Sequence, residues 1–215
     1  TKRQRKYPIF NNAYMMTGSH HLYNYLPTKH EKWLTMIKQE IIDSGLIVDI
    51  LNAKTMEDVF RLLQGCSFLG SFLAYQYTID MNYSPYINFS ENDFVKAGIG
   101  AIRGIKKCFL CYGNKCEDAI WYVKEHFNDL QKRYGYTSFH PLLGHEPTLI
   151  DLQNCFCETD KYLRAKMPEL RIGNVRIKQK YMPHTDPIQF FFPPKWNIVE
   201  MYKYKPIVVP TLFDL

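Results

Sequence analysis

Apolar residues recur every three or four positions along most of the chain, and this spacing predicts helices. The clearest example is residues 29–44, where Trp33, Met36, Ile37, Ile41 and Ile42 share one face. Gly45 directly follows and is expected to end this helix. Periodicity alone therefore already favours a helical protein.

Further helices are predicted from caps and apolar runs. Thr55 is a cap-like residue with acidic residues behind it, so a helix is expected to begin there. Residues 67–82 are almost wholly apolar but too short to cross a membrane, which indicates a buried central helix. Residues 117–134 read as one long helix, with a loop at 136–147 behind it. Thr148 is expected to cap a last helix that runs to about Met167.

Regular spacing is lost from Gly173 onward. Val175, Ile177 and Tyr181 are compatible with a short strand, and six prolines in the last 35 residues favour an extended arm that packs around the core. We therefore predict an all-α fold of six to eight helices in a single helical domain. Its parts are a basic N-terminal arm at 1–8, the helical domain at 9–170, and an extended basic, Pro-rich C-terminal arm at 171–215.

The stretch from Phe89 to Phe109 is typical of a helix-hairpin-helix. Ser90 and Asp93 predict a short capped helix, Gly98-Ile99-Gly100 a tight turn, and the residues that follow a second helix. The glycines would permit positive φ angles and leave N–H groups open at a helix N-terminus, where a phosphate is favoured. Arg103, Lys106 and Lys107 would add positive charge. The same glycines also fit an ordinary helix end before a surface helix, so both interpretations stay open.

The net charge and the lack of membrane-type segments bear on the partners and the location of the protein. The chain has 27 Lys and Arg against 21 Asp and Glu, a net charge of +6, which suits double-stranded DNA or simply a solvated basic surface. Neither a signal peptide nor an apolar run of membrane-spanning length is visible. We therefore expect an intracellular protein, nuclear in a eukaryote or in the host cytoplasm for a virus.

The six cysteines do not imply disulfides. Cys108, Cys111 and Cys116 resemble half of a metal site, but the pattern lacks a second close pair. Cys108 is expected on the buried side of its helix. We therefore predict structural cysteines, no metal and no cofactor.

The helix from Thr148 carries the best candidate for chemistry. Asp151, Asn154, Glu158 and Lys161 share one face opposite an apolar stripe of Leu149, Leu152, Phe156 and Leu163. Such a face could line a pocket that reads a base flipped out of DNA. A surface helix would show the same polar line, and Asp151 also stands at an ordinary capping-box position behind Thr148.

Three blocks resemble the helical domain of 5-hydroxymethyluracil DNA kinases and of the related α-glutamyl/putrescinyl thymine pyrophosphorylases. They are residues 9–14, residues 68–109 and residues 148–162. One departure is Met15, which stands where the family has an Arg after Asn-x-Tyr. The resemblance implies an all-helical, DNA-glycosylase-like core that acts on or recognises a 5-substituted uracil in DNA.

The resemblance also carries the family's polar residues onto this chain. Glu158 and Asp151 become candidate catalytic residues. Candidate substrate-binding residues are Asn154, Gln153, Asp160, Lys161, Glu91 and Asp93. Candidate DNA-binding residues are Gly98, Gly100, Arg103, Lys106, Lys107 and Arg164.

Whether the chain is itself an enzyme stays open. It lacks a Gly-x4-Gly-Lys-Ser/Thr motif, so it is not expected to be the kinase itself. It could be a base-modifying transferase or pyrophosphorylase, or the helical partner of a P-loop kinase domain or of other subunits in a DNA-modification complex. The alternative is a catalytically silent scaffold that binds DNA or protein within a larger complex.

Overall fold

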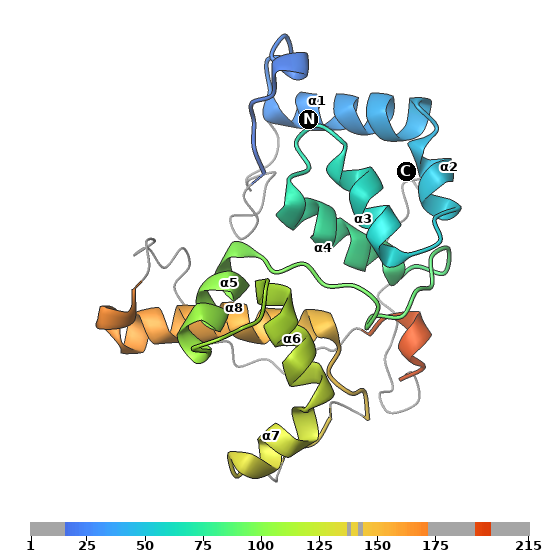
Figure 1. Ribbon diagram of the computed structural model, residues 1–215. Helices are drawn as coiled ribbons and strands as arrows, with labels where there is room; N and C mark the ends of the chain where they lie inside the picture. Colours follow the sequence, from blue (N-terminus) through green and yellow to red (C-terminus); the bar gives the residue numbers. More distant parts are fainter. Residues whose placement is uncertain (1–15, 137–138, 142–143, 172–191, 199–215) are drawn as a thin grey trace, which may run out of the picture.

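A computed structural model describes residues 16–136, 139–141, 144–171 and 192–198 of the chain. Over these ranges the protein contains eight α-helices and no strand, which confirms the all-α prediction (Figure 1). The helices are α1 (Lys29–Met36), α2 (Leu46–Leu51), α3 (Met56–Gln64), α4 (Ser71–Asn82), α5 (Ile99–Cys108), α6 (Cys116–Glu125), α7 (Phe127–Arg133) and α8 (Leu149–Lys166). None of these helices is long and apolar enough to cross a membrane.

The first four helices form one group, at the top of Figure 1. Thr28 and Glu31 form a capping box at the start of α1, and the helix continues as a π-helix at Ile37–Asp43. Gly45 ends it in the left-handed conformation at φ 81°, which glycine adopts without steric cost. The prediction for residues 29–44 is confirmed.

Helices α3 and α4 confirm two further predictions, one of them with a shifted start. Thr55 and Asp58 form the expected capping box of α3. Helix α4 is largely buried but begins at Ser71 rather than near residue 67, because Phe68 adopts a φ of 66° and interrupts the helix. The Phe68 ring stacks on Trp33 at a centroid distance of 5.2 Å, and this packing holds the interruption in place.

Residues 117–134 do not form one helix, so that prediction was wrong. The chain leaves helical geometry at His126, with φ −107° and ψ 19°, and separates α6 from α7. The His126 imidazole Nδ1 lies 2.9 Å from the Tyr122 carbonyl oxygen. The bend allows Phe127 to pack edge-on against Phe139 at 5.4 Å, a tertiary contact that local periodicity cannot reveal.

The first helix of the predicted hairpin is also absent. Residues 90–93 form a turn closed by the Asp93 N–H, which donates to the Ser90 carbonyl, and residues 94–98 run extended into α5. The extended run places the Phe94 ring against Phe60 and brings the Ala97 N–H to the Glu117 carboxylate. These long-range contacts replace the hydrogen bonds that a short helix would make.

The hairpin glycines have a different role from the one expected. Neither Gly98 nor Gly100 has a positive φ; Gly98 has φ −70° and is the N-cap of α5. A Cβ on Gly100 would lie 2.5 Å from the Cys157 Sγ, and one on Gly104 would lie 2.0 Å from the Phe156 carbonyl oxygen. The glycines therefore let α5 approach α8 closely.

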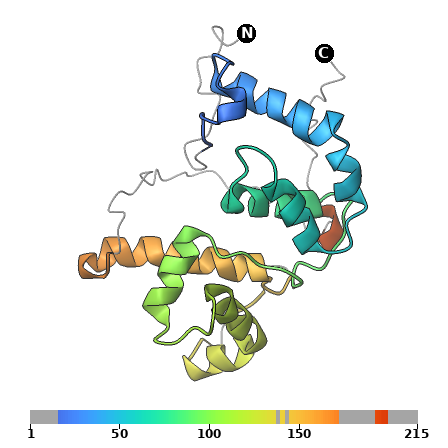
Figure 2. The ribbon, with the colours of Figure 1, turned by 45° about the horizontal axis from the view of Figure 1, so that its top comes forward.

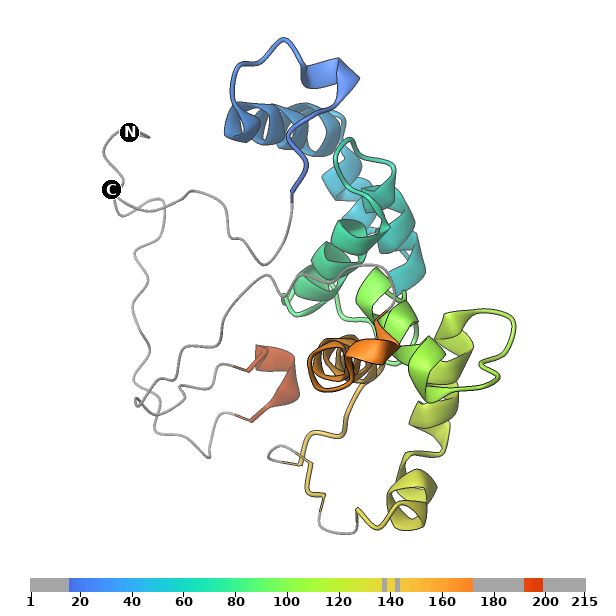
Figure 3. The same cartoon turned by 90° about the vertical axis from the view of Figure 1, so that its left-hand side faces the viewer.

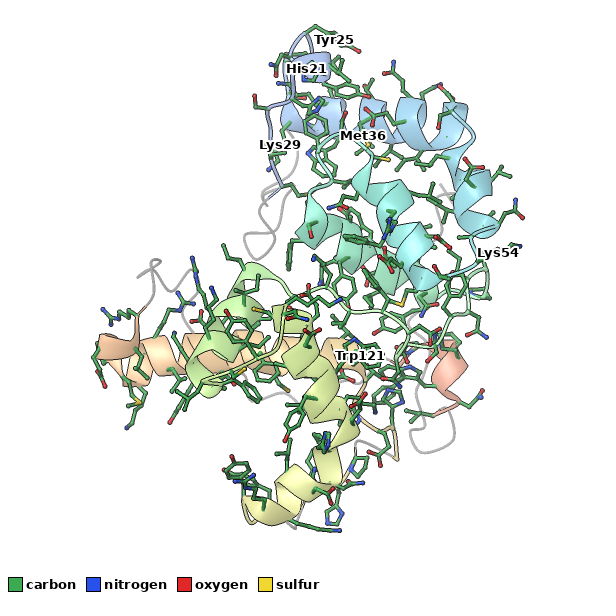
Figure 4. All side chains as sticks on the ribbon, viewed as in Figure 1. His21, Tyr25, Lys29, Met36, Lys54 and Trp121 are labelled. Carbon is green, nitrogen blue, oxygen red and sulfur yellow. The ribbon has the colours of Figure 1, made fainter. Side chains whose placement is uncertain are left out.

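Helices α5 and α8 make the most extensive helix contact described, and Figure 2 shows them crossing. Seen nearly along α8, α5 lies on one side of it and residues 194–196 on the other (Figure 3). One cluster of buried apolar side chains extends through both helix groups, from Trp33 and Met36 to Leu149 and Phe156. Met36, labelled in Figure 4, points from α1 toward α3 and α4.

Much of the predicted terminal arms lies outside the described residues. This holds for the basic segment at 1–8, for the block at 9–14, and for the strand at Val175, Ile177 and Tyr181. Residues 192–198 are described and include a short 3-10 helix at Pro194–Trp196. Within it, the Lys195 ammonium donates to the carbonyl oxygens of Asn82 and Phe89, so this piece of the C-terminal arm packs on the loop after α4.

Candidate functional site

The start of α5 is fixed by a side chain from α8. The Gln153 Oε1 accepts the Gly98 N–H at 3.2 Å, and its Nε2 donates to the Asn154 Oδ1 at 2.9 Å. Gln153 is almost fully buried. It therefore positions the N-terminus of α5, and its side-chain oxygen and amide group are both engaged within the protein.

An exposed positive edge begins at this helix start. The N-cap residue of α5 is Gly98, which provides no side-chain cap for the first-turn N–H groups of Ile99 and Gly100. Ala101, the next residue, is fully buried. Ile99 is 68% exposed, Arg103 is half-buried and Lys106 is exposed. Their spacing of four and then three residues places them on one face. We call the first-turn N–H groups, Arg103 and Lys106 the basic edge of α5.

Three of the predicted site residues instead form a buried ionic cluster between α5 and α8. The Lys107 ammonium lies 2.5 Å from the Asp160 Oδ1, and the Arg164 Nε lies 3.1 Å from the Asp160 Oδ2. The side chains of Lys107 and Asp160 are only 3% and 2% exposed. A paired, buried ammonium cannot reach a DNA phosphate, so the structure separates these residues from the basic edge and gives them a role in joining the two helices.

The predicted polar face of α8 is divided between capping and solvent. The Asp151 carboxylate accepts from the Thr148 N–H and hydroxyl at 2.8 and 2.9 Å, which is the capping box. Asn154 is exposed. Glu158 is exposed and forms an ion pair with Lys161, and its hydrogen bond raises the pKa of the Lys161 ammonium. The opposite stripe is buried as expected at Leu149, Leu152 and Phe156.

A buried carboxylate at the start of α6 ties the extended segment to the second helix group. The Glu117 Oε1 accepts the Ala97 N–H at 3.0 Å and lies 3.0 Å from the Lys96 ammonium. Burial acts to raise the pKa of Glu117, but the hydrogen bonds from Ala97 and from Lys96 outweigh it, so the pKa lies below its ordinary value. The ionised Glu117 carboxylate therefore holds Lys96 and Ala97, which lead into α5.

A polar cavity of about 490 Å³ lies at the N-terminal end of α8. Its wall is formed by the turn at residues 88–92, by His145 and Thr148, and by Lys195 and Trp196. The Glu91 carboxylate, 8% exposed, accepts the Trp196 indole N–H at 2.8 Å. The Trp196 ring stacks on the His145 imidazole with centroids 3.7 Å apart.

Sequence reasoning proposed Glu91 as a substrate-binding residue but missed the other residues of this cavity. Asp93, proposed with it, is exposed and does not line the cavity. Trp196 lies 105 positions after Glu91 in the chain, and no local pattern links the two. Burial lowers the pKa of the Lys195 ammonium, partly offset by the Glu91 carboxylate.

The cysteines differ from expectation at one point. Cys108, the last residue of α5, is exposed rather than buried. Over the described ranges, no group of three or more His, Cys, Asp and Glu side chains is placed to hold a metal ion. The half-site at Cys108, Cys111 and Cys116 is therefore not completed by a described residue.

Taken together, the fold and the site define an all-helical domain in which two closely packed helices carry a cationic edge on α5 and a polar cavity at the N-terminal end of α8. The chain belongs to the family of 5-hmdU DNA kinase helical domains, whose model matches residues 1–172. This match confirms the resemblance found in the sequence and relates the chain to hydroxymethyluracil modification of DNA. No curated protein and no solved structure matches it.

Proposed function

We propose that this chain is the DNA-binding helical component of a system that modifies 5-hydroxymethyluracil in DNA, and that a P-loop kinase domain supplies the phosphoryl transfer. The family match carries this proposal, since it spans most of the chain and names a DNA kinase. The chain itself has no Gly-x4-Gly-Lys-Ser/Thr motif, which fits a division of labour between binding and transfer.

The basic edge of α5 is the proposed contact to the DNA backbone. Uncapped N–H groups at a helix N-terminus and the helix dipole both favour a phosphate. Gly98 and Gly100 pack against Gln153 and Cys157 of α8, and the half-buried Arg103 and the exposed Lys106 extend the positive charge along α5. Contacts of this kind fix register and supply affinity but do not read sequence.

The test is a comparison of DNA duplexes that differ at one base. Wild-type protein should bind a duplex with a single 5-hydroxymethyluracil more tightly than the matched thymine duplex. Arg103→Ala/Lys106→Ala should weaken binding to both duplexes about equally. Lys54→Ala/Lys132→Ala removes the same charge from exposed positions away from α5 and should have little effect. Equal affinity of wild-type protein for the two duplexes would contradict base recognition.

A role as a docking scaffold is the second candidate, and an apolar cleft favours it. The cleft measures about 530 Å³ and lies between α1, its π-helical extension and α4, with Leu34 64% exposed at its edge. Exposed apolar surface of this kind marks protein contacts. Leu34→Glu should abolish binding of a purified kinase domain, whereas Leu110→Glu, at another exposed leucine, should not. Unchanged binding by Leu34→Glu would argue against docking here.

Direct catalysis by the polar face of α8 remains a prediction. Asp151 is engaged in capping, while Asn154 and Glu158 are exposed and line neither the polar cavity nor the apolar cleft. If Glu158 is the acting carboxylate, Glu158→Gln should abolish turnover by the assembled system while the domain stays folded. Full turnover by that variant would remove Glu158 from the chemistry.

A further inference from the structure

Three buried polar atoms around the polar cavity find no hydrogen-bond partner among the described residues. They are the Glu91 Oε1, the Asn92 Oδ1 and the His145 Nε2, and all three residues line the cavity. Buried polar groups are almost always paired, so a cluster of unpaired ones in one cavity calls for a bound partner. A ligand that satisfies all three atoms would remove their desolvation penalty.

The contacts around these atoms hold them in place before any ligand arrives. The second oxygen of Glu91 accepts the Trp196 indole N–H, and the Tyr83 hydroxyl also bonds to this carboxylate. A carboxylate has about four acceptor sites, so Oε1 can still accept from a ligand. The His145 ring is held by its stack on Trp196, and the Asn92 N–H donates to the Ser90 hydroxyl at 3.1 Å. A preorganised set of this kind favours binding because little further ordering is needed.

The chemistry of the three atoms selects the kind of ligand. Two are oxygen acceptors, and the third is an imidazole nitrogen that donates when it carries a proton. The 5-hydroxymethyluracil base offers two donors, N3–H and the hydroxymethyl O–H, and between them the acceptor O4. Thymine has the same ring but lacks the hydroxyl. These two donors and O4 thus match the three cavity atoms in type, the acceptor O2 lies outside this set, and thymine leaves one cavity acceptor unpaired.

The cavity and the start of α5 meet neighbouring turns of α8, on different sides of that helix (Figure 3). Thr148 lines the cavity, and Gln153, five residues along the same helix, holds the first residue of α5. At 1.5 Å per residue the two points lie roughly 8 Å apart along α8. A volume of about 490 Å³ falls in the ordinary range of small-molecule pockets.

We propose that this cavity receives the flipped 5-hydroxymethyluracil base, with Glu91 and Asn92 accepting from its two donors and His145 donating to O4. The proposal rests on the function proposed above and adds the place where the base is read. It assigns specificity to Glu91, Asn92 and His145 and backbone affinity to the basic edge of α5. Base flipping is the general route by which proteins reach a base inside a duplex.

The variants follow from the hydrogen bonds. In Glu91→Gln, the side-chain oxygen can still accept from Trp196, so the NH2 group replaces the free acceptor and opposes a donor on the base. Thymine offers only the N3–H donor and is expected to stay paired in the duplex, so both acceptor contacts contribute to the preference for 5-hydroxymethyluracil. That preference should fall about tenfold, the effect of losing one hydrogen bond to a charged group. Asn92→Leu should reduce it similarly, and Asn92→Asp, which keeps an acceptor, should retain it.

The matched control is Glu125→Gln, which removes the same charge from an exposed carboxylate on α6, outside the cavity lining, and should leave the preference unchanged. Affinity for the thymine duplex should be the same in all folded variants. A wild-type preference that persists in Glu91→Gln and Asn92→Leu would place the base elsewhere and overturn this inference, while the proposed function stands. No preference in wild-type protein would overturn both.

A second measurement does not depend on any variant folding. A 2-aminopurine placed opposite 5-hydroxymethyluracil loses its pairing partner when that base is flipped, so its fluorescence should rise when wild-type protein binds. The same probe opposite thymine should rise much less. An equal response in the two duplexes would contradict recognition of a flipped 5-hydroxymethyluracil base.

Discussion

At the scale of single residues, Gly104 makes the closest fit of any described glycine, against α8. Alanine within a helix is normally favoured over glycine by about 0.5–1 kcal/mol. Here the added Cβ would lie 2.0 Å from the Phe156 carbonyl oxygen, and forced overpacking costs about 1–3 kcal/mol. We expect Gly104→Ala to lower the free energy of unfolding, as measured by urea denaturation.

The matched control is Gly18→Ala. Its new Cβ would meet the Lys29 side chain at 3.5 Å, an ordinary van der Waals contact, so stability should change by no more than about 0.5 kcal/mol. A stabilised Gly104→Ala protein would show that α5 and α8 do not pack this closely.

Two carboxylates of α8, Asp160 and Glu158, form ion pairs, and their removal should change the free energy of unfolding by different amounts. Asp160 is buried between Lys107 and Arg164, and Asp160→Asn leaves two poorly compensated cations, which should cost about 3–5 kcal/mol of stability. Glu158 pairs with Lys161 in solvent, and Glu158→Gln should change stability by less than about 1 kcal/mol. Equal, small losses in urea denaturation would mean that Asp160 is not a structural residue.

At the scale of elements, Glu117 links α6 to the extended segment that leads into α5. Its pKa is lowered in the folded protein, so its contribution to stability is complete above the unfolded pKa of about 4.3 and is lost as pH falls through the folded pKa. We expect Glu117→Gln to be less stable than wild type at pH 7 and the difference to close toward pH 3. Urea midpoints between pH 3 and 7 measure this. A difference that is independent of pH would contradict an ionised Glu117.

The elements that the sequence predicts correctly are those fixed by neighbouring residues. Caps at Thr55 and Thr148 and the stop at Gly45 act within four positions, so a local pattern is sufficient to find them. The turn at residues 90–93 and the break at His126 depend on partners such as Phe60, Glu117 and Phe139. Both segments have a local sequence pattern that favours a helix, but contacts with distant residues favour the turn and the break more strongly.

The candidate site was predictable only in part, for the same reason. Exposed charge at Arg103 and Lys106 follows from helix geometry. Burial of Lys107 depends on Asp160, 53 positions away, and the cavity depends on a tryptophan 105 positions from Glu91. A single sequence does not specify which distant residues meet.

At the scale of the whole molecule, we propose that DNA recognition is divided between two places joined by α8. The basic edge of α5 would hold the backbone, and the cavity at the other end of the Thr148–Gln153 stretch would read the base. Loss of the basic edge should weaken binding to every duplex. Loss of the cavity contacts should change only the preference between bases.

The most direct test of the central claim, that this helical domain binds DNA through α5, is the salt dependence of its affinity for a duplex. Arg103→Ala/Lys106→Ala should reduce the slope of log K against log salt by about one unit for each lost phosphate contact, while Lys54→Ala/Lys132→Ala should match wild type. A folded Arg103→Ala/Lys106→Ala protein with the affinity and slope of wild type would contradict the claim.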